Sequence, residues 1–288
     1  MERAAVQTSR FLYINLSKSQ LSGRLAFKLN MQKICSVNDL KSLDLEILRR
    51  KMQGLRFYYR GQADSSWTIP TTLYRAFGDS LSDDEVWAKY IKCYDNFKQY
   101  AISQGLLRWK PDTENEDFYL LSTARHLGFN CHLLDWTASL DIAILFACSE
   151  YPQTDGALWI LSTKQHVNQA PIRESPFDVE SPKLICKEYD LIPDGKGCGD
   201  FPLGRLRRSR QNGLLSIIPR DFLTRSFCTL LDNEHFLIKI LIASEAKSEL
   251  LEYVQGKGIN REFLYGKHSA EEDRALSFIT ELNKSLKS

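Results

Sequence analysis

The chain has 288 residues, of which 43% are hydrophobic and 26% charged, an ordinary globular composition that allows a sizeable core. Its formal net charge of +2 excludes recognition of nucleic acid or membrane through overall charge, so such a partner would need a local basic patch. The seven cysteines form no CxxC pair, which disfavours zinc-ribbon and thioredoxin-like sites and indicates reduced thiols in a cytoplasm. We expect no signal peptide at the start, and no apolar run reaches the ~18 residues of a membrane span.

Hydrophobic periodicity, turn residues and helix caps predict helices and short strands that alternate only loosely. In chain order we expect a helix starting at Ser36, a strand at 55–60, helices over 81–104 and 116–127, a strand at 133–136, a helix over 139–148, strands at 156–162, 214–218 and 236–242, and helices over 244–255 and 271–286. Gly105 and Gly128 are suited to end the helices before them. The proline-interrupted stretch 171–201 is expected to be irregular. This arrangement favours an α+β fold over a doubly wound parallel sheet.

The stretch FYYRGQADSSWTIPTTLYR, over 57–75, places Arg60 at the end of an aromatic strand. Its guanidinium is suited to a phosphate or carboxylate, because the planar fork offers paired donors. Gly61 would allow a ligand to approach the main chain. Gln62 and Trp67 make the stretch both polar and aromatic, as in a ligand groove. A lone arginine is more often in a structural ion pair, and that alternative stays open.

The stretch LLDWTASLDIAILFA, over 133–147, carries an acid at the junction of a strand and a helix. Asp135, Thr137 or Ser139 can cap this helix, and a helix start can equally hold an anionic ligand. Trp136 is more often a core residue than a stacking platform. The nearby His126 and His132 share no helical face with an acid, so no metal site is expected.

A third stretch, GRLRRSRQNGLLSIIPR over 204–220, holds the one dense basic cluster of a nearly neutral chain. The cluster consists of Arg205, Arg207, Arg208 and Arg210, followed by Gln211 and a predicted strand. Such runs are usually solvated, but this one leads directly into a strand, which should hold some of its side chains in place. Phosphate binding, in a dinucleotide or in RNA, is the functional alternative.

Taken in order, YYRGQADSSWTIPTTLYR, RHLGFNCHLLDWTASLDIAILFA and RRSRQNGLLSI resemble the successive motifs of the FRG domain family, and the resemblance extends over about 55–265. The sequence departs from the family pattern at several positions. Arg125 stands in place of a frequent glutamine, and His132 in place of an arginine, so a phosphate contact at His132 is in doubt. The family's layout is similar to that of arginine-type ADP-ribosyltransferases. The resemblance therefore implies an ADP-ribosyltransferase-like split β-sheet core with surrounding helices over 55–288, preceded by a helical extension over 1–54.

The same resemblance implies NAD as substrate and assigns roles to the motif residues. Arg60 would grip the dinucleotide and the Gly61 main chain would meet the nicotinamide amide, while Gln62, Trp136, Thr137 and Arg208 would support binding. Asp135 and Gln211 would be catalytic together with Arg60. Because Gln211 stands where a glutamate belongs and carries no charge, Asp135 is expected to supply the anion that stabilises the ribosyl cation.

The function expected from this resemblance is a toxin-like transfer of ADP-ribose to a macromolecule. The arginines at 205–210 favour RNA over protein as acceptor, because phosphate contacts are strongly stabilising. By analogy an inhibitory protein partner is expected, and no membrane. The main alternative is a non-catalytic nucleotide- or nucleic-acid-binding module, since the carboxylate is missing at Gln211. A purely structural interaction protein is the third alternative.

Overall fold

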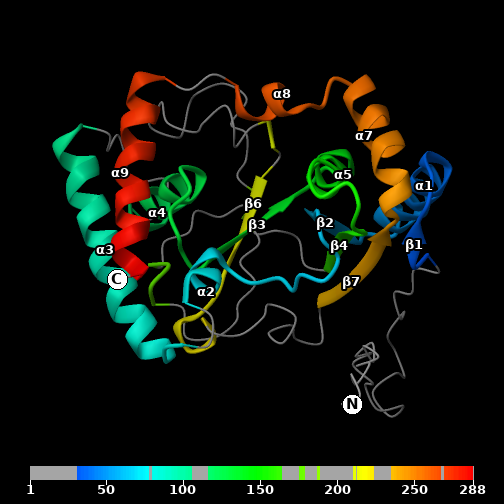
Figure 1. Ribbon diagram of the computed structural model, residues 1–288. Coiled ribbons are helices and arrows are strands. Elements are labelled where there is room, and N and C mark those ends of the chain that lie inside the picture. Colours follow the sequence, from blue (N-terminus) through cyan, green and yellow to red (C-terminus); the bar gives the residue numbers. More distant parts are fainter. Residues whose placement is uncertain are drawn as a thin grey trace, which may run out of the picture. The chain divides into compact units, whose positions relative to one another are not determined.

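A mostly antiparallel sheet of seven strands organises the computed structural model (Figure 1). The structure describes residues 31–77, 80–105, 116–163, 175–178, 187–188, 210–211, 213–223, 235–266 and 269–287. Residues 31–288 form one compact unit, and residues 31–54, which we assigned to an N-terminal extension, contribute a strand and a helix to it. None of the helices in these ranges is both long and apolar enough to cross a bilayer.

The strands of this sheet differ in how many residues pair with their neighbours. They are β1 (Lys33–Ile34), β2 (Arg56–Gln62), β3 (Leu133–Thr137), β4 (Gly156–Thr163), β5 (Lys187–Glu188), β6 (Gly213–Ile217) and β7 (His235–Ile242), in the spatial order β1-β7-β4-β2-β3-β6-β5. All neighbours are antiparallel except β1 and β7. Strand β2 pairs with β4 along its whole length, but with β3 at one position, Tyr59 opposite Thr137. The sheet is therefore only weakly joined between β2 and β3.

Two groups of helices lie on either side of this junction (Figure 1). The described helices are α1 (Val37–Met52), α2 (Thr72–Phe77), α3 (Asp83–Ser103), α4 (Glu116–His126), α5 (Leu140–Cys148), α7 (Lys247–Gly256), α8 (Arg261–Tyr265) and α9 (Ala270–Lys287), with 3-10 turns at Arg220–Phe222 and Ser244–Ala246. Helices α3, α4 and α9 gather around one end of the sheet, and α1, α5 and α7 around the other. Capping fits these boundaries: Ser82 and Glu85 form a capping box on α3, and Ser139 caps α5.

Alternating residues of β3 and β6 enter two different apolar clusters, as the pleat of a strand requires. Leu133 and Leu215 belong to the cluster that contains the inner faces of α3, α4 and α9. Leu134, Trp136 and Leu214 belong to a cluster on the opposite face, together with side chains of β2 and β4. Both faces of β3 are therefore packed, and only its polar residues are left for other contacts.

The predicted α+β class and the predicted elements in the described ranges are confirmed. The glycines that were expected to end α3 and α4 have positive φ angles, 61° at Gly105 and 91° at Gly128. The two-residue strands β1 and β5 and the short helices α2 and α8 were not predicted, because such short elements carry no readable periodicity. Most of the irregular stretch 171–201 lies outside the described residues.

Candidate functional site

The three motif segments singled out in the sequence meet at the centre of the sheet. Strands β2, β3 and β6, which carry or follow these segments, are consecutive neighbours. Arg60 Nη1 donates to the main-chain carbonyl of Asp135 at 2.7 Å, across the weakly paired β2–β3 junction. The Thr137 hydroxyl donates to the carbonyl of Gln211 at 2.7 Å, which ties the residues before β6 to the end of β3. Residues that are 74 and 75 positions apart in the chain are thus held together by direct hydrogen bonds.

Three arginines lie near Asp135, and one of them contacts its carboxylate. Arg125, at the end of α4, forms an ion pair with Asp135 Oδ2. The side chain of Arg125 is 12% exposed and that of Asp135 39%, so this pair is partly shielded from water. Arg60 and Arg75 lie close enough to act electrostatically on the pair. We call Arg60, Arg75 and Arg125 the arginine cluster.

The arginine cluster carries more positive charge than its surroundings balance. Burial, with repulsion from Arg125 and Arg75, lowers the pKa of Arg60 to about 10, although Asp135 opposes this. Burial and the charge of Arg125 also lower the pKa of Arg75. Burial disfavours the charged form of Arg125 too, but the charge of Asp135 outweighs it and raises the Arg125 pKa. Three guanidinium groups near one carboxylate leave a local excess of two positive charges, which suits an anionic ligand.

Part of the hydrogen-bonding capacity of the arginine cluster is unused. The Nε atoms of Arg60 and Arg125 are buried and have no hydrogen-bond partner. Arg75 is more open to solvent than the other two arginines, although its guanidinium is desolvated enough to lower its pKa. A buried donor without a partner is costly, so the Nε groups of Arg60 and Arg125 are expected to gain free energy when an acceptor such as a phosphate oxygen binds.

Gly61 and Gln62 make packing and hydrogen-bond contacts within the protein. A Cβ at Gly61 would lie 1.8 Å from the carbonyl oxygen of Ala143, so the close approach that this glycine allows is that of α5. Gln62 is buried, its amide nitrogen donates to Thr68 O at 2.7 Å, and its oxygen accepts from Trp159 Nε1 at 2.6 Å. Both residues therefore fix β2 against its neighbours, and the Gly61 side of the strand is already occupied by α5.

In the LLDWT strand some side chains lie in the core, and the Asp135 carboxylate lies beside the arginine cluster. Trp136 is 3% exposed and donates its indole N–H to Ser216 Oγ at 2.9 Å, so its ring lies in the core. Thr137 accepts from the main chain of Ser139, and Ser139 in turn caps α5. Asp135 pairs with Arg125 and does not act as the cap. The corner between β3 and α5 therefore places the Asp135 carboxylate beside the arginine cluster.

The basic cluster at 205–210 is described only at its last residue. Arg205, Arg207 and Arg208 lie outside the described residues. Arg210 donates to Phe263 O at 3.0 Å and its guanidinium lies 5.7 Å from the centre of the Phe263 ring. This arginine is thus fixed against α8, as the sequence indicated for part of the run. The side chain of Gln211 is partly exposed.

His132 is a core residue, not a phosphate contact. Its ring nitrogens lie 2.8 Å from Tyr90 Oη and 3.1 Å from Pro176 O, and burial lowers its pKa to about 4. Among the described residues, no group of three His, Cys, Asp or Glu side chains could hold a metal ion.

Arg75 and Arg125 were not among the predicted site residues. The available signal was that both lie in the recognised motifs, Arg75 closing the first and Arg125 opening the second. Local sequence could not place either of them beside Arg60, because that contact depends on how α2 and α4 dock.

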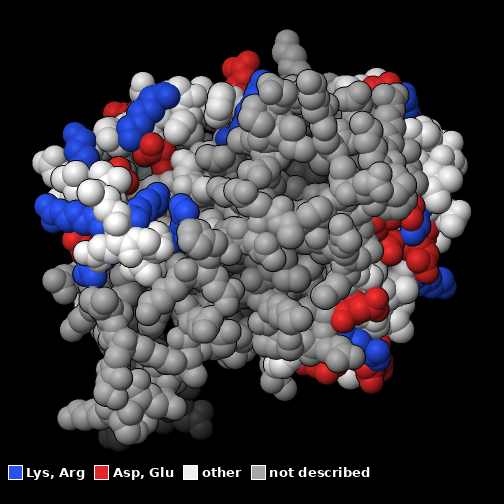
Figure 2. All heavy atoms as spheres, turned by 180° about the vertical axis from the view of Figure 1, so that it is seen from behind, with Lys and Arg blue, Asp and Glu red and all other residues white. Residues whose placement is uncertain are grey.

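Charge is unevenly distributed on the described surface. In the view from behind, Lys and Arg side chains are frequent toward the edge where α1 lies, and Asp and Glu side chains toward the edge where α3 lies (Figure 2). The last turn of α1 carries Arg49, Arg50 and Lys51, whereas the first turn of α3 carries three acids. The net charge of +2 thus hides regions of opposite sign.

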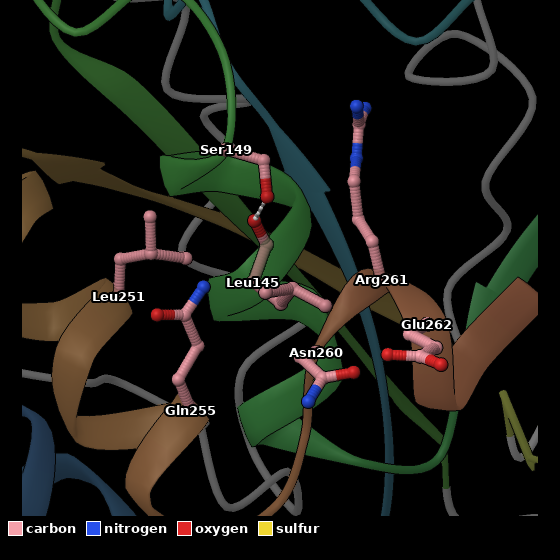
Figure 3. Close-up of a pocket in the computed structure, with 7 residues that line it drawn as sticks. All are labelled: Leu145, Ser149, Leu251, Gln255, Asn260, Arg261 and Glu262. Carbon is pink, nitrogen blue, oxygen red and sulfur yellow. Dashed lines mark hydrogen bonds between the residues drawn. The ribbon is translucent and has the colours of Figure 1, made fainter.

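A separate pocket of about 340 Å³ lies between α5, α7 and α8 (Figure 3). Its lining includes Leu145 from α5, Ser149 directly after that helix, Leu251 and Gln255 from α7, and Arg261 from α8. None of these residues belongs to the arginine cluster, so the pocket is a distinct feature of the molecule.

Residues 55–156 match the model of the FRG domain family. This range contains the Arg60 strand, the whole arginine cluster and the LLDWT strand, and it ends at the start of β4. Comparisons with the curated proteins and with the solved structures found no match. The rest of the expected resemblance, from 157 to 265, lies outside the matched range. The resemblance to the FRG domain family is therefore confirmed over residues 55–156.

Proposed function

We propose that this protein is a toxin-like, NAD-dependent ADP-ribosyltransferase that modifies a macromolecular acceptor in the cytoplasm. The observation that carries the proposal is the arginine cluster, in which three guanidinium groups interact electrostatically with the single carboxylate of Asp135. The neighbouring positions of β2, β3 and β6 support it because they bring together the three motif segments that the proposed reaction needs in one site.

The arginine cluster would bind the pyrophosphate of NAD. A pyrophosphate linkage carries two negative charges, and the cluster has an excess of two positive charges, three arginines less one aspartate. Charge-assisted hydrogen bonds between arginine and phosphate are about twice as strong as neutral ones. The buried Nε atoms of Arg60 and Arg125, which have no partner, would then find acceptors.

Asp135 would stabilise the transition state. Breaking the bond between nicotinamide and ribose builds positive charge on the sugar, so a fixed anion nearby lowers the barrier. The Asp135 carboxylate is 39% exposed and already fixed by Arg125, so a substrate can reach it. Gln211 would hydrogen-bond a ribose hydroxyl without contributing charge. Loss of one such electrostatic contact costs roughly 3–4 kcal/mol in other enzymes.

The test is nicotinamide release and transfer of label from NAD in the presence of total RNA or cell lysate. The wild-type protein is expected to label a macromolecule, and Arg125→Lys is expected to lower the rate at least about tenfold, because lysine keeps the charge but loses the paired donors. Arg220→Lys is the matched control: Arg220 forms an exposed pair with Asp84 outside the arginine cluster, so its rate should not change. If the wild-type protein releases no nicotinamide under these conditions, the proposed reaction is wrong.

A non-catalytic nucleotide-binding or nucleic-acid-binding module is the second candidate. It is favoured by the pairing of the Asp135 carboxylate with Arg125 and by the uncharged side chain of Gln211. In this case NAD or a nucleic acid would bind through the arginine cluster and be recovered intact. Arg60→Ala would then weaken binding, whereas Gln211→Ala would leave every cellular effect unchanged.

The proposed acceptor is RNA, with protein as the alternative. The support is the run of four arginines from Arg205 to Arg210, although the arrangement of the first three lies outside the described residues. Digesting the labelled product with ribonuclease or with protease distinguishes the two acceptors. We also propose an inhibitory protein partner, which co-expression with neighbouring genes would test through rescue of growth.

A further inference from the structure

Helix α1 has apolar side chains on two opposite faces. The residues that hold it against the rest of the protein are Leu40, Leu43 and Ile47, all buried. On the other side of the helix, Leu45, Leu48 and Met52 are 57%, 54% and 82% exposed. These three are spaced three and four residues apart, so they form one stripe along the helix, which we call the outer stripe. They make up three of the seven large hydrophobic side chains that are exposed in the described ranges, so exposed apolar surface is concentrated on this helix.

The outer stripe lies on a helix that is fixed in place. Helix α1 packs beside β1 and α7 at one edge of the molecule (Figure 1). Its first turn is held by Ser36 Oγ, which accepts from Asp39 N at 3.2 Å, and by Val37 N, which donates to Glu249 of α7 at 3.5 Å. The outer side of a helix in such a position is normally polar. An apolar stripe there is typical of a surface that another molecule covers.

The charges of α1 change sign along the helix. Its acids lie in the first part and are Asp39, Asp44 and Glu46, whereas the bases of its last turn are Arg49, Arg50 and Lys51. The exception is Lys41, whose ammonium lies 5.4 Å from the centre of the Tyr253 ring on α7. Two such helices packed antiparallel would bring acids against bases at both ends, and their dipoles would also oppose each other. Packed parallel, they would bring like charges together.

Asp44 and Lys51 fit this antiparallel arrangement in detail. They are seven residues apart and therefore flank the outer stripe on the same side. A twofold axis midway between them, next to Leu48, places Asp44 of each copy opposite Lys51 of the other. Both side chains are exposed, and Lys51 Nζ lies 5.8 Å from the centre of the Tyr59 ring, a contact that a carboxylate would replace. The outer stripe and its flanking charges are thus complementary to themselves.

Other occupants fit the outer stripe less well. The stretch 1–30 contains five Lys or Arg residues and one acid, Glu2, so it has little to offer the basic end of α1. A membrane of anionic lipids would attract that basic end but repel the carboxylates of Asp44 and Glu46. A second copy of the chain supplies the right charge at both ends.

We propose that the outer stripe is the interface of a homodimer, in which α1 packs antiparallel against α1 of a second copy about a twofold axis. Leu48 lies next to the axis and contacts its counterpart, and Leu45 of one copy contacts Met52 of the other. One helix pair buries less area than the interface of a tight complex, so the expected dimer is weak, with a Kd of about 10 μM. The proposal does not depend on the proposed transferase reaction.

The test is sedimentation velocity of the full chain at about 1 to 100 μM, a range that spans the expected Kd. Leu48→Glu is expected to raise the Kd at least about tenfold, because it places a charge at the centre of the interface. Its Tm should stay that of the wild-type monomer, since Leu48 is exposed. Ile102→Glu is the matched control: Ile102 is an exposed apolar residue on α3, so its Kd should not change.

Charge reversal tests the antiparallel arrangement itself. Asp44→Lys and Lys51→Asp each place like charges opposite one another twice, so each should raise the Kd about tenfold. The double variant, and an equimolar mixture of the two single variants, should associate like the wild type because opposite charges face each other again.

Three results would overturn the homodimer. They are a wild-type protein that stays monomeric over the whole range, a dimer that Leu48→Glu leaves unchanged, and a double charge reversal that fails to restore association. Nicotinamide release by the Leu48→Glu monomer should equal that of the dilute wild type, so the dimer and the transferase reaction are tested separately.

Discussion

Replacing Asp135 by asparagine removes the one carboxylate that balances the arginine cluster. Breaking a fully buried ion pair costs 3–5 kcal/mol in general, and an exposed pair contributes about 0–1 kcal/mol. With Arg125 12% exposed and Asp135 39% exposed, this pair lies between those limits. We therefore expect a loss of about 2 kcal/mol in the free energy of unfolding. For a domain of this size, that is a fall of roughly 4–8 °C in Tm.

Bound anions should restore the stability that Asp135→Asn loses. An ordinary structural ion pair would show no such effect, so this measurement distinguishes it from an anion site. Pyrophosphate at about 100 times its Kd would add about 2.7 kcal/mol of stability, and its effect should be larger in Asp135→Asn, because the repelling carboxylate is gone. Thermal unfolding of both proteins in chloride and in pyrophosphate is the assay. Asp141→Asn is the matched control, since Asp141 pairs with Lys257 on the surface at 2.9 Å, and its Tm should change little in either buffer. If pyrophosphate stabilises neither the wild type nor Asp135→Asn, the arginine cluster is not an anion site.

Three further predictions concern the residues that hold the site together. Gly61→Ala should lower the free energy of unfolding by about 3 kcal/mol or more in urea titrations, because the new methyl group would overlap the carbonyl of Ala143 on α5; wild-type stability would show that no such contact exists. Trp136→Ala should cost about 3–5 kcal/mol through loss of a core aromatic, and a normally stable variant would instead make Trp136 a ligand platform. The pKa of His132 is lowered to about 4 by burial, against about 6.5 in the unfolded chain, so the unfolded state binds more protons between these values. Stability should therefore be complete above pH 6.5 and fall by up to about 3 kcal/mol toward pH 4, and a pH dependence that persists unchanged in His132→Asn would contradict this assignment.

Local sequence was sufficient for the elements that present the site. Strand β2 follows from the aromatic run around Tyr58, and α3 from its apolar residues three or four apart and the glycine at its end. The end of α4 and the start of α5 follow in the same way from Gly128 and Ser139. Each of these signals acts within a few residues of the chain, through backbone preference or a capping hydrogen bond, so each can be read without knowing the fold.

The roles of the site residues depended on contacts that no local pattern encodes. Glycine at position 61 predicted a close approach, but only the tertiary structure showed that the approaching group is α5. Arg60, on β2, was expected to hold an anion. Only the tertiary structure showed that Arg75 from α2 and Arg125 from α4 lie near it.

The sequence by itself thus determined the α+β class, the boundaries of the main elements and the resemblance to the FRG domain family, because periodicity, caps and motifs are properties of the chain. Only the tertiary structure decided which side chains share a site, since the docking of α2, α4 and α5 onto the sheet is governed by long-range packing. That packing places Trp136 in the core, pairs Asp135 with Arg125, and leaves the arginine cluster with an excess of positive charge.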